Sequence, residues 1–152
     1  MLQLKDVYGA ENQILKALPK MAKEANSSEL RQAFETHLKE TEGQVERLKK
    51  VFQAMGQKTS GEKCQALEGI VAEAEDMIGE AEDAEVRDAG MIAAAQAVEH
   101  YEIARYGTLI AWAKQLKKED VSNLLQETLK EEKHADDLLS KIAWESVNKK
   151  AA

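Results

Sequence analysis

The sequence is poor in residues that several common folds and functions require. It has one cysteine, Cys64, so no disulfide can form within the chain, and a reducing compartment is the simpler setting. It has one proline, Pro19, and only 5% aromatic residues. No useful stretch alternates between apolar and polar residues with a period of two, so we predict no strands.

Basic residues are outnumbered, and long apolar runs are missing. The chain carries 21 lysines and arginines against 28 acidic residues, for a net charge of -7 and a pI near 5.1. Counterion-release binding needs a basic patch, so no nucleic-acid partner is expected. No apolar run reaches the roughly 18 to 20 residues of a membrane span, and no charged-then-apolar leader opens the sequence. We therefore expect a soluble, cytoplasmic protein with no membrane partner.

What the sequence does contain favours helix. Charged residues make up 32% and apolar residues 43% of the 152 positions, with much Ala, Leu, Glu, Lys and Gln. A chain of this length buries roughly two-thirds of the surface that its unfolded form exposes, which is enough for a core. We expect residues 1–152 to form a single domain.

Apolar residues recur at three- and four-residue steps in five segments, as on the buried face of a helix. The segments cover about residues 4–25, 30–55, 62–83, 85–117 and 120–147. Asn26 and Glu29 have the spacing of a capping box, which predicts the start of the second helix. Two long helices joined tightly, a long connection and two more joined tightly indicate an all-α, ferritin-like four-helix bundle. Its one long crossover carries an additional short helix.

Four glutamates lie in stripes that are otherwise apolar: Glu11, Glu40, Glu102 and Glu131. If the crossover runs the length of the bundle, the two hairpins turn at opposite ends. Glu11 then lies about 16 residues before the first turn and Glu40 about 13 after it, and Glu102 and Glu131 lie equally far from the second turn. At 1.5 Å per residue, all four fall near mid-height, within roughly 5 Å. Convergence at one height favours a metal site.

Histidines accompany these carboxylates. His37 and Glu99 share a level about one turn from the four glutamates, and His134 falls near Glu40. Glu131 and His134 have the Glu-x-x-His spacing that puts two ligands on one helix face, and His37 and Glu40 have the reverse order. A carboxylate-rich site with one or two imidazoles suits iron or manganese, whereas structural zinc prefers cysteine and histidine. Two divalent cations would offset several carboxylates.

Each of these residues also has a simpler interpretation. A single glutamate in a helical stripe is more often a boundary residue whose carboxylate reaches water. His100 lies off the stripe and is expected to pack or to support a ligand. Tyr8 and Tyr106 flank the proposed site by one turn and are expected mainly to pack. Trp112 and Trp144 are expected in the core or at an interface.

Several stretches of the sequence closely resemble the YciE/YciF family of bacterial stress proteins. The resemblance runs through residues 4–11, 36–48, 86–89, 98–107 and 127–133, and the run Glu99-His100-Tyr101-Glu102 is its most specific part. It implies a ferritin-like fold, a dimer and a metal centre within the bundle. It also implies a set of metal ligands: Glu11, His37, Glu40, Glu99, Glu102 and Glu131. His134 is not a position that the family motif fixes, and it stays a prediction from spacing.

Our leading hypothesis is a dinuclear metal protein of the bacterial stress response with two iron ions, or alternatively manganese. It would act on a small oxidant such as peroxide or oxygen, or bind iron, and whether it turns over as an oxidoreductase is left open. Glu40 and Glu102 are the expected bridging ligands because they lie at mid-height, with Glu11, Glu131 and His37 as terminal ligands. The alternatives are a non-catalytic helical homodimer that acts as a scaffold, and catalase-like manganese chemistry.

Overall fold

The computed structural model describes residues 1–152, which form helices and no strands. Four long helices make the bundle: α1 (Leu2–Glu24), α2 (Ser28–Ala54), α4 (Ala84–Gln115) and α5 (Glu119–Ile142). The crossover carries α3 (Gln65–Glu80), and a π-helical turn η1 (Ala143–Val147) leads into the short α6 (Asn148–Ala151). The predicted ferritin-like bundle with a helical crossover is confirmed. No helix has the combined length and apolar content that a membrane span requires.

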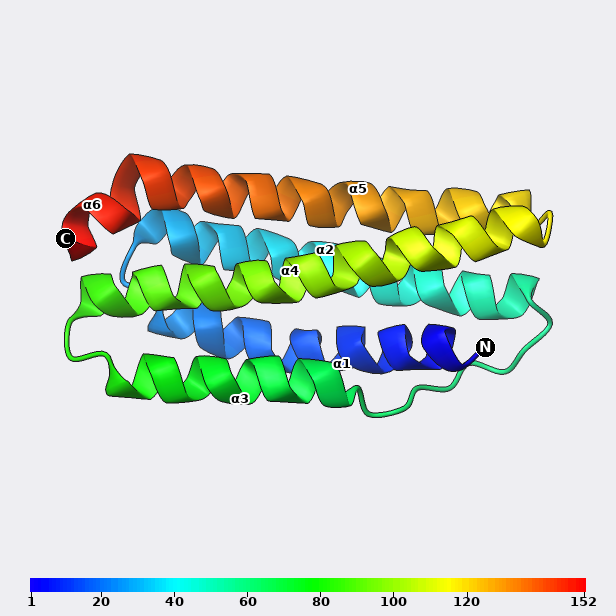
Figure 1. The fold of residues 1–152 in the computed structure, drawn as a ribbon, viewed down its shortest axis with the longest axis horizontal. Coiled ribbons are helices and arrows are strands. Elements are labelled where there is room, and N and C mark those ends of the chain that lie inside the picture. The colour runs from blue at the N-terminus through cyan, green and yellow to red at the C-terminus, as the bar shows by residue number, and fades with distance from the viewer.

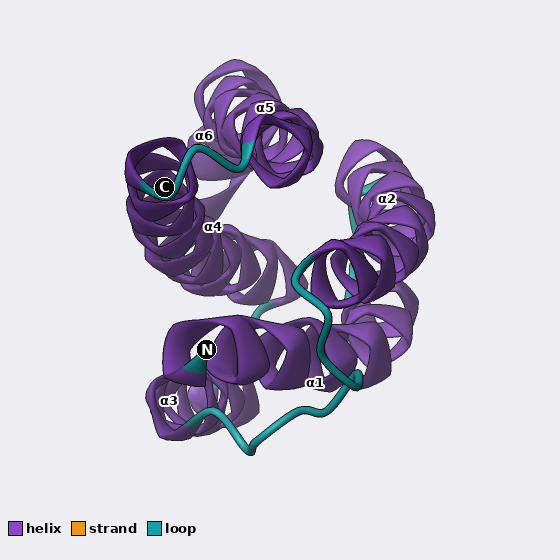
Figure 2. Cartoon of the chain, turned by 90° about the vertical axis from the view of Figure 1, so that its right-hand side faces the viewer, coloured by secondary structure: helices purple, strands orange, loops and turns teal.

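The two hairpins turn at opposite ends of the bundle, as the sequence predicted. Figure 1 shows the α1–α2 turn at one end and the α4–α5 turn at the other, with the crossover and α3 spanning the length between them. The end-on view in Figure 2 shows α3 outside the four long helices, beside α1. It packs against α4 and α1 and thereby covers one side of the bundle.

Apolar side chains form two separate buried clusters rather than one core. The first core holds 17 residues near the α1–α2 turn, and the second core holds 11 residues toward the α4–α5 turn. Between them, each long helix turns a buried polar residue inward. We call this group the polar layer, and its members are Glu11, His37, Thr41, Gln44, Glu99, Glu102, Thr128 and Glu132. The polar layer therefore lies near mid-height, where the residue count placed a site.

The α1–α2 turn is fastened to α4 by one carboxylate. Asp88 is buried and accepts hydrogen bonds from the backbone N–H groups of Asn26, at 2.9 Å, and Ser27, at 2.6 Å. The Ser27 side chain caps α2 by accepting from the Leu30 N–H at 3.3 Å. The predicted capping box of Asn26 and Glu29 is therefore wrong by one position, because Asp88 already holds the Asn26 amide.

The crossover approaches α1 at a glycine. The backbone N–H of Glu62 donates to the carbonyl of Lys5 at 3.2 Å. A Cβ atom added at Gly9 would lie 1.6 Å from the carbonyl oxygen of Glu62. Only a residue without a side chain allows the crossover to lie against α1 here.

Replacing Gly9 with alanine is expected to destabilise the protein by about 1–3 kcal/mol, because the overpacked backbone of the crossover has to move away from α1. The matched control is Gly43→Ala on α2, where an added Cβ meets nothing within 4 Å. That change is expected to add about 0.5–1 kcal/mol, because alanine favours the helix. Guanidinium unfolding midpoints measure both changes, and equal effects of the two substitutions would contradict the close approach.

Candidate metal centre

Four residues of the polar layer converge on one point from three helices. His37 comes from α2, Glu99 and Glu102 from α4, and Glu132 from α5. Each can offer one ligand atom such that all four atoms lie within 4.8 Å of one another. Glu99 and Glu102 reach the same point because residues three apart share a helix face. We call these four residues the central cluster.

Glu11 of α1 adds a fifth polar group beside the central cluster. It is fully buried, and the Tyr106 hydroxyl donates a short hydrogen bond to its Oε1 atom. Burial, together with the charge of Glu132, raises the pKa of Glu11 to about 8, although the hydrogen bond from Tyr106 and the charge of His37 oppose the rise. Tyr106 is therefore more than a packing residue, in contrast to its expected role.

Most of the side-chain oxygen and nitrogen atoms of these five residues form no hydrogen bond within the protein. The buried atoms without a hydrogen bond are Oε2 of Glu11, Oε2 of Glu99, both carboxyl oxygens of Glu102, both of Glu132 and both ring nitrogens of His37. Buried polar atoms are almost always hydrogen-bonded, and leaving them unpaired is costly. An assembly of unpaired carboxylate oxygens and imidazole nitrogens at one point is the donor set of a hard or borderline metal cation.

The carboxyl groups resist ionisation in the absence of a cation. Burial raises the pKa of Glu99 to about 7, and burial together with neighbouring carboxylates raises the pKa values of Glu102 and Glu132 well above the ordinary range. The dry interior disfavours charge, and the like charges repel one another. A bound cation would reverse both effects.

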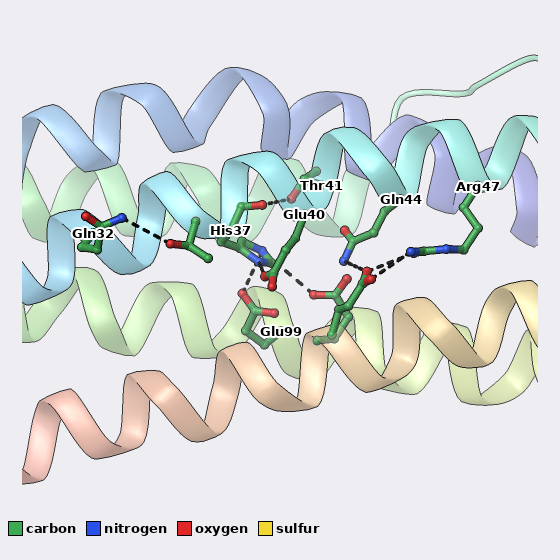
Figure 3. A network of polar contacts seen from close by, with 10 residues as sticks. Gln32, His37, Glu40, Thr41, Gln44, Arg47 and Glu99 are labelled. Atoms are coloured by element: carbon green, nitrogen blue, oxygen red, sulfur yellow. Dashed lines mark hydrogen bonds and ion pairs between the residues drawn. The ribbon is translucent and has the colours of Figure 1, made fainter.

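The surroundings favour the charged form of His37, whereas they favour the neutral form of the neighbouring carboxyl groups. Its Nε2 atom lies 3.2 Å from Oε1 of Glu99 and 4.0 Å from Oε2 of Glu132, and its Nδ1 atom lies 3.7 Å from Glu40 (Figure 3). Burial lowers the pKa of His37, but Glu40, Glu132 and Glu11 together outweigh burial and raise it. The Thr41 hydroxyl donates to the backbone carbonyl of His37 at 2.8 Å.

At the edge of the polar layer, the cationic side chain of Arg47 on α2 binds residues of α5. Arg47 binds both carboxyl oxygens of Glu131 at 2.8 and 2.9 Å, and it also donates to Thr128 at 2.7 Å and to Glu127 at 3.1 Å. Gln44 donates to the same Glu131 carboxylate at 3.1 Å. Figure 3 shows Gln44 and Arg47 pointing toward this carboxylate. Bidentate pairing of this kind fixes Glu131 firmly in place.

The family described as "Domain of unknown function (DUF892)" matches residues 1–152, the whole chain. The chain belongs to the DUF892 family. Protein YciF of Escherichia coli strain K12 is 49% identical over 149 residues, which cover 97% of this chain and 90% of YciF. The resemblance to the YciE/YciF family is thereby confirmed.

Solved structures agree with this assignment. The E. coli stress protein YciF superposes with a TM-score of 0.92 at 48% identity, over 97% of this chain and 94% of YciF. YcfI from Rhodopseudomonas palustris gives 0.90 at 51% identity, over 91% of this chain and 88% of YcfI. A protein of Xanthomonas campestris gives 0.75 at 21% identity, over 92% and 86% of the two chains, and shows likeness of fold alone.

In this DUF892 protein, four of the seven residues predicted as ligands lie together in the polar layer: Glu11, His37, Glu99 and Glu102. Glu40 lies at the edge of the layer, with 30% of its side chain exposed. His134 is exposed on α5, and His100 is exposed and lies 3.1 Å from Asp136 through its Nε2 atom. That the buried four bind a metal stays a prediction.

The predicted position of Glu131 on the buried stripe of α5 was wrong, because Glu132 is the residue that turns inward. Glu132 is fully buried, whereas Glu131 is partly exposed and paired with Arg47. Counting from Thr128 to Ala135, steps of three and four pass through either glutamate, so periodicity cannot choose between them. The face that carries Glu132 also buries Val121, Leu125 and Leu139, and Glu131 lies beside it in an ion pair with Arg47 of α2.

The metal-free protein is expected to lose thermal stability as the pH rises from about 5 to 8. Glu11 and Glu99 have pKa values of about 8 and 7 in the folded state against an ordinary 4.5. The folded state therefore holds more protons, and its advantage, complete below pH 4.5, disappears as both groups ionise. Melting temperatures by circular dichroism in the presence of a chelator measure the decline.

The Glu99→Gln variant serves as the control for this pH dependence. An amide cannot ionise, so its melting temperature should fall less steeply over the same range. A wild-type melting temperature that stays flat or rises between pH 5 and 8 would show that these carboxyl groups are not desolvated as described.

Proposed function

We propose that the protein holds two iron ions, or alternatively two manganese ions, in the polar layer. The observation that carries the proposal is the set of buried carboxyl oxygens without a partner. Glu11, Glu99, Glu102 and Glu132 would together carry four negative charges when ionised, and two divalent cations would balance them. A single divalent cation would leave half of that charge uncompensated in a dry interior.

The donor chemistry favours iron or manganese over zinc or copper. The layer offers many carboxylate oxygens, one buried imidazole and no thiolate. Cys64 is not available as a ligand, because its Sγ atom lies 3.0 Å from the Tyr101 hydroxyl and caps α3. Carboxylate-rich sites with an imidazole suit iron and manganese, whereas soft sulfur ligands select other metals.

The structure suggests a role for each side chain. Glu102 and Glu132 have both carboxyl oxygens free of protein partners, so each can bridge two cations. Glu132 therefore takes the bridging role that the sequence analysis gave to Glu40. Glu40 would instead be a ligand at the edge of the polar layer. Tyr106 holds one oxygen of Glu11 and directs the other toward the cluster as a terminal ligand.

Bound iron or manganese would supply redox chemistry on a small oxidant such as peroxide or oxygen. The protein residues would hold the charge, exclude water and fix the ligand orientations. YciF of E. coli is described as a stress protein. We propose a related role for this chain in the bacterial cytoplasm, in handling peroxide or oxygen or in binding iron.

Substituting Glu132 with glutamine is expected to reduce the metal content of the purified protein from about two equivalents to one or none, because it removes a bridging carboxylate. Glu131→Gln is the matched control on the neighbouring position, and it should retain the metal because Glu131 is already bound to Arg47. Inductively coupled plasma mass spectrometry after growth in iron-rich or manganese-rich medium measures both.

Two outcomes would contradict the site. One is a wild-type protein that contains no iron or manganese under either growth condition. The other is a loss of metal in Glu131→Gln that equals the loss in Glu132→Gln. That result would mean that Glu132 is not the specific ligand from α5. Circular dichroism of both variants establishes that each is folded.

A second candidate function is a helical homodimer that acts as a scaffold. Its support is the exposed apolar surface: Trp112 in the last turn of α4 and Leu116, which follows the helix, are 50% and 63% exposed, and Trp144 is 77% exposed. Large exposed apolar side chains are typical of interaction surfaces. Such a protein would not require a metal in the polar layer.

A strong chelator distinguishes these two functions. If bound cations neutralise the layer, chelation should lower the melting temperature by several degrees, because ligands that bind only the folded state stabilise it by mass action. A scaffold dimer should instead show a melting temperature that depends on protein concentration and is unchanged by the chelator. The melting curve is recorded with and without chelator at two protein concentrations, and readdition of ferrous or manganous salt should restore any loss.

A further inference from the structure

A cavity of about 470 Å³ lies beside the central cluster, between the first core and the protein surface. Residues from α1, α2, α3, α4 and α5 line it, and 18 of its 28 lining residues are hydrophobic. Its volume falls within the roughly 300–1,000 Å³ of small-molecule sites, which are mostly apolar with a few polar groups. His37, Glu40 and Glu99 belong to the lining, so the cavity reaches the edge of the central cluster.

The cavity exists because small side chains occupy positions where a packed bundle would have large ones. Alanines line it from four of the long helices, and they include Ala17, Ala33, Ala94, Ala95 and Ala135. Helix bundles normally fill such inward positions with leucine or isoleucine, because interiors are close-packed. The result is a largely apolar cavity that opens to the surface beside the first core, and this shape suits a bound molecule.

The charged residues that α4 contributes to the lining change sign between its start and its middle. Arg87 lies near the start of the helix, and its Nε atom is buried without a hydrogen-bond partner. Glu99 lies twelve residues further on, or about 18 Å along the axis. Between them the lining residues of α4 are apolar: Met91, Ala94, Ala95 and Val98. Lys20, another cation of the lining, is already paired with Glu75 at 2.9 Å.

We propose that this cavity binds an elongated apolar molecule with one anionic end, such as a long-chain carboxylate. The anionic group pairs with Arg87, and the apolar chain lies along the alanine-lined space toward the central cluster. Arginine suits this role because its planar guanidinium matches a carboxylate. The binding rests on the cavity alone, so it stands whether or not the polar layer holds a metal.

Isothermal titration of the purified protein with dodecanoate, dodecanol and dodecylammonium, below their micelle concentrations, tests the proposal. Dodecanoate is expected to bind saturably and at least about tenfold more tightly than dodecanol, because a hydrogen bond to a charged group adds to the burial of the chain. Dodecylammonium should bind most weakly. The measurement is repeated after chelation and should give the same affinities.

Two kinds of variant locate the site. Arg87→Gln should lower the affinity for dodecanoate about tenfold and leave dodecanol unchanged. Ala95→Leu should weaken both by at least about tenfold, because the larger side chain occupies the cavity. Ala93→Leu, exposed two residues away on α4, is the matched control and should bind as the wild type does. If one of these variants fails to fold, Ala94→Leu replaces Ala95→Leu, and Arg87→Met replaces Arg87→Gln, because methionine also removes the positive charge.

The outcomes are decisive in either direction. Binding that is not saturable, or that survives filling of the cavity, overturns the site. Equal affinity for dodecanoate and dodecanol, or a preference for dodecylammonium, overturns the anionic end. Dodecanoate binding that both Arg87→Gln and Ala95→Leu weaken, while Ala93→Leu does not, supports the proposal even if the metal content of the protein proves to be zero.

Discussion

Repulsion among buried carboxyl groups is the constraint on which the rest of this structure depends. Glu11, Glu99, Glu102 and Glu132 come from three helices and meet in the interior, where each is at most 2% exposed. Such a group is tolerable only if it is protonated or neutralised by cations. The two apolar cores on either side hold the helices together and keep the polar layer at mid-height. The bundle is thus built around a layer that weakens it unless it is neutralised.

The fold could be predicted from the sequence because the helical periodicity and the lengths of the connections indicate the same arrangement. Helical periodicity, tight connections at opposite ends and a long crossover leave few arrangements other than this bundle. The depth of the polar layer followed from residue counts alone, because helices have a fixed rise per residue. Residue counts therefore predicted Glu11 and Glu102 at mid-height, with His37 and Glu99 about one turn away.

The details that the sequence missed depend on contacts between helices. Glu131 and Glu132 fit the periodicity of α5 equally well, and only the packed helices show that Glu132 turns inward while Glu131 pairs with Arg47 across the α2–α5 interface. Tyr106 looked like a packing residue because its hydroxyl partner, Glu11, lies 95 positions away in sequence. The cavity escaped notice for a similar reason: a single alanine means nothing until alanines from several helices face one another.

The buried Asp88 links the two hairpins in a way that bears on how the chain folds. Its carboxylate accepts hydrogen bonds from the backbone amides of Ser27 and Asn26, which lie 61 and 62 residues earlier in the chain. We therefore expect the amides of Asn26 and Ser27 to stay hydrated until α4 docks against the first hairpin. Final ordering of the first hairpin would then be a late, non-local event, although the two helices themselves are neighbours in sequence.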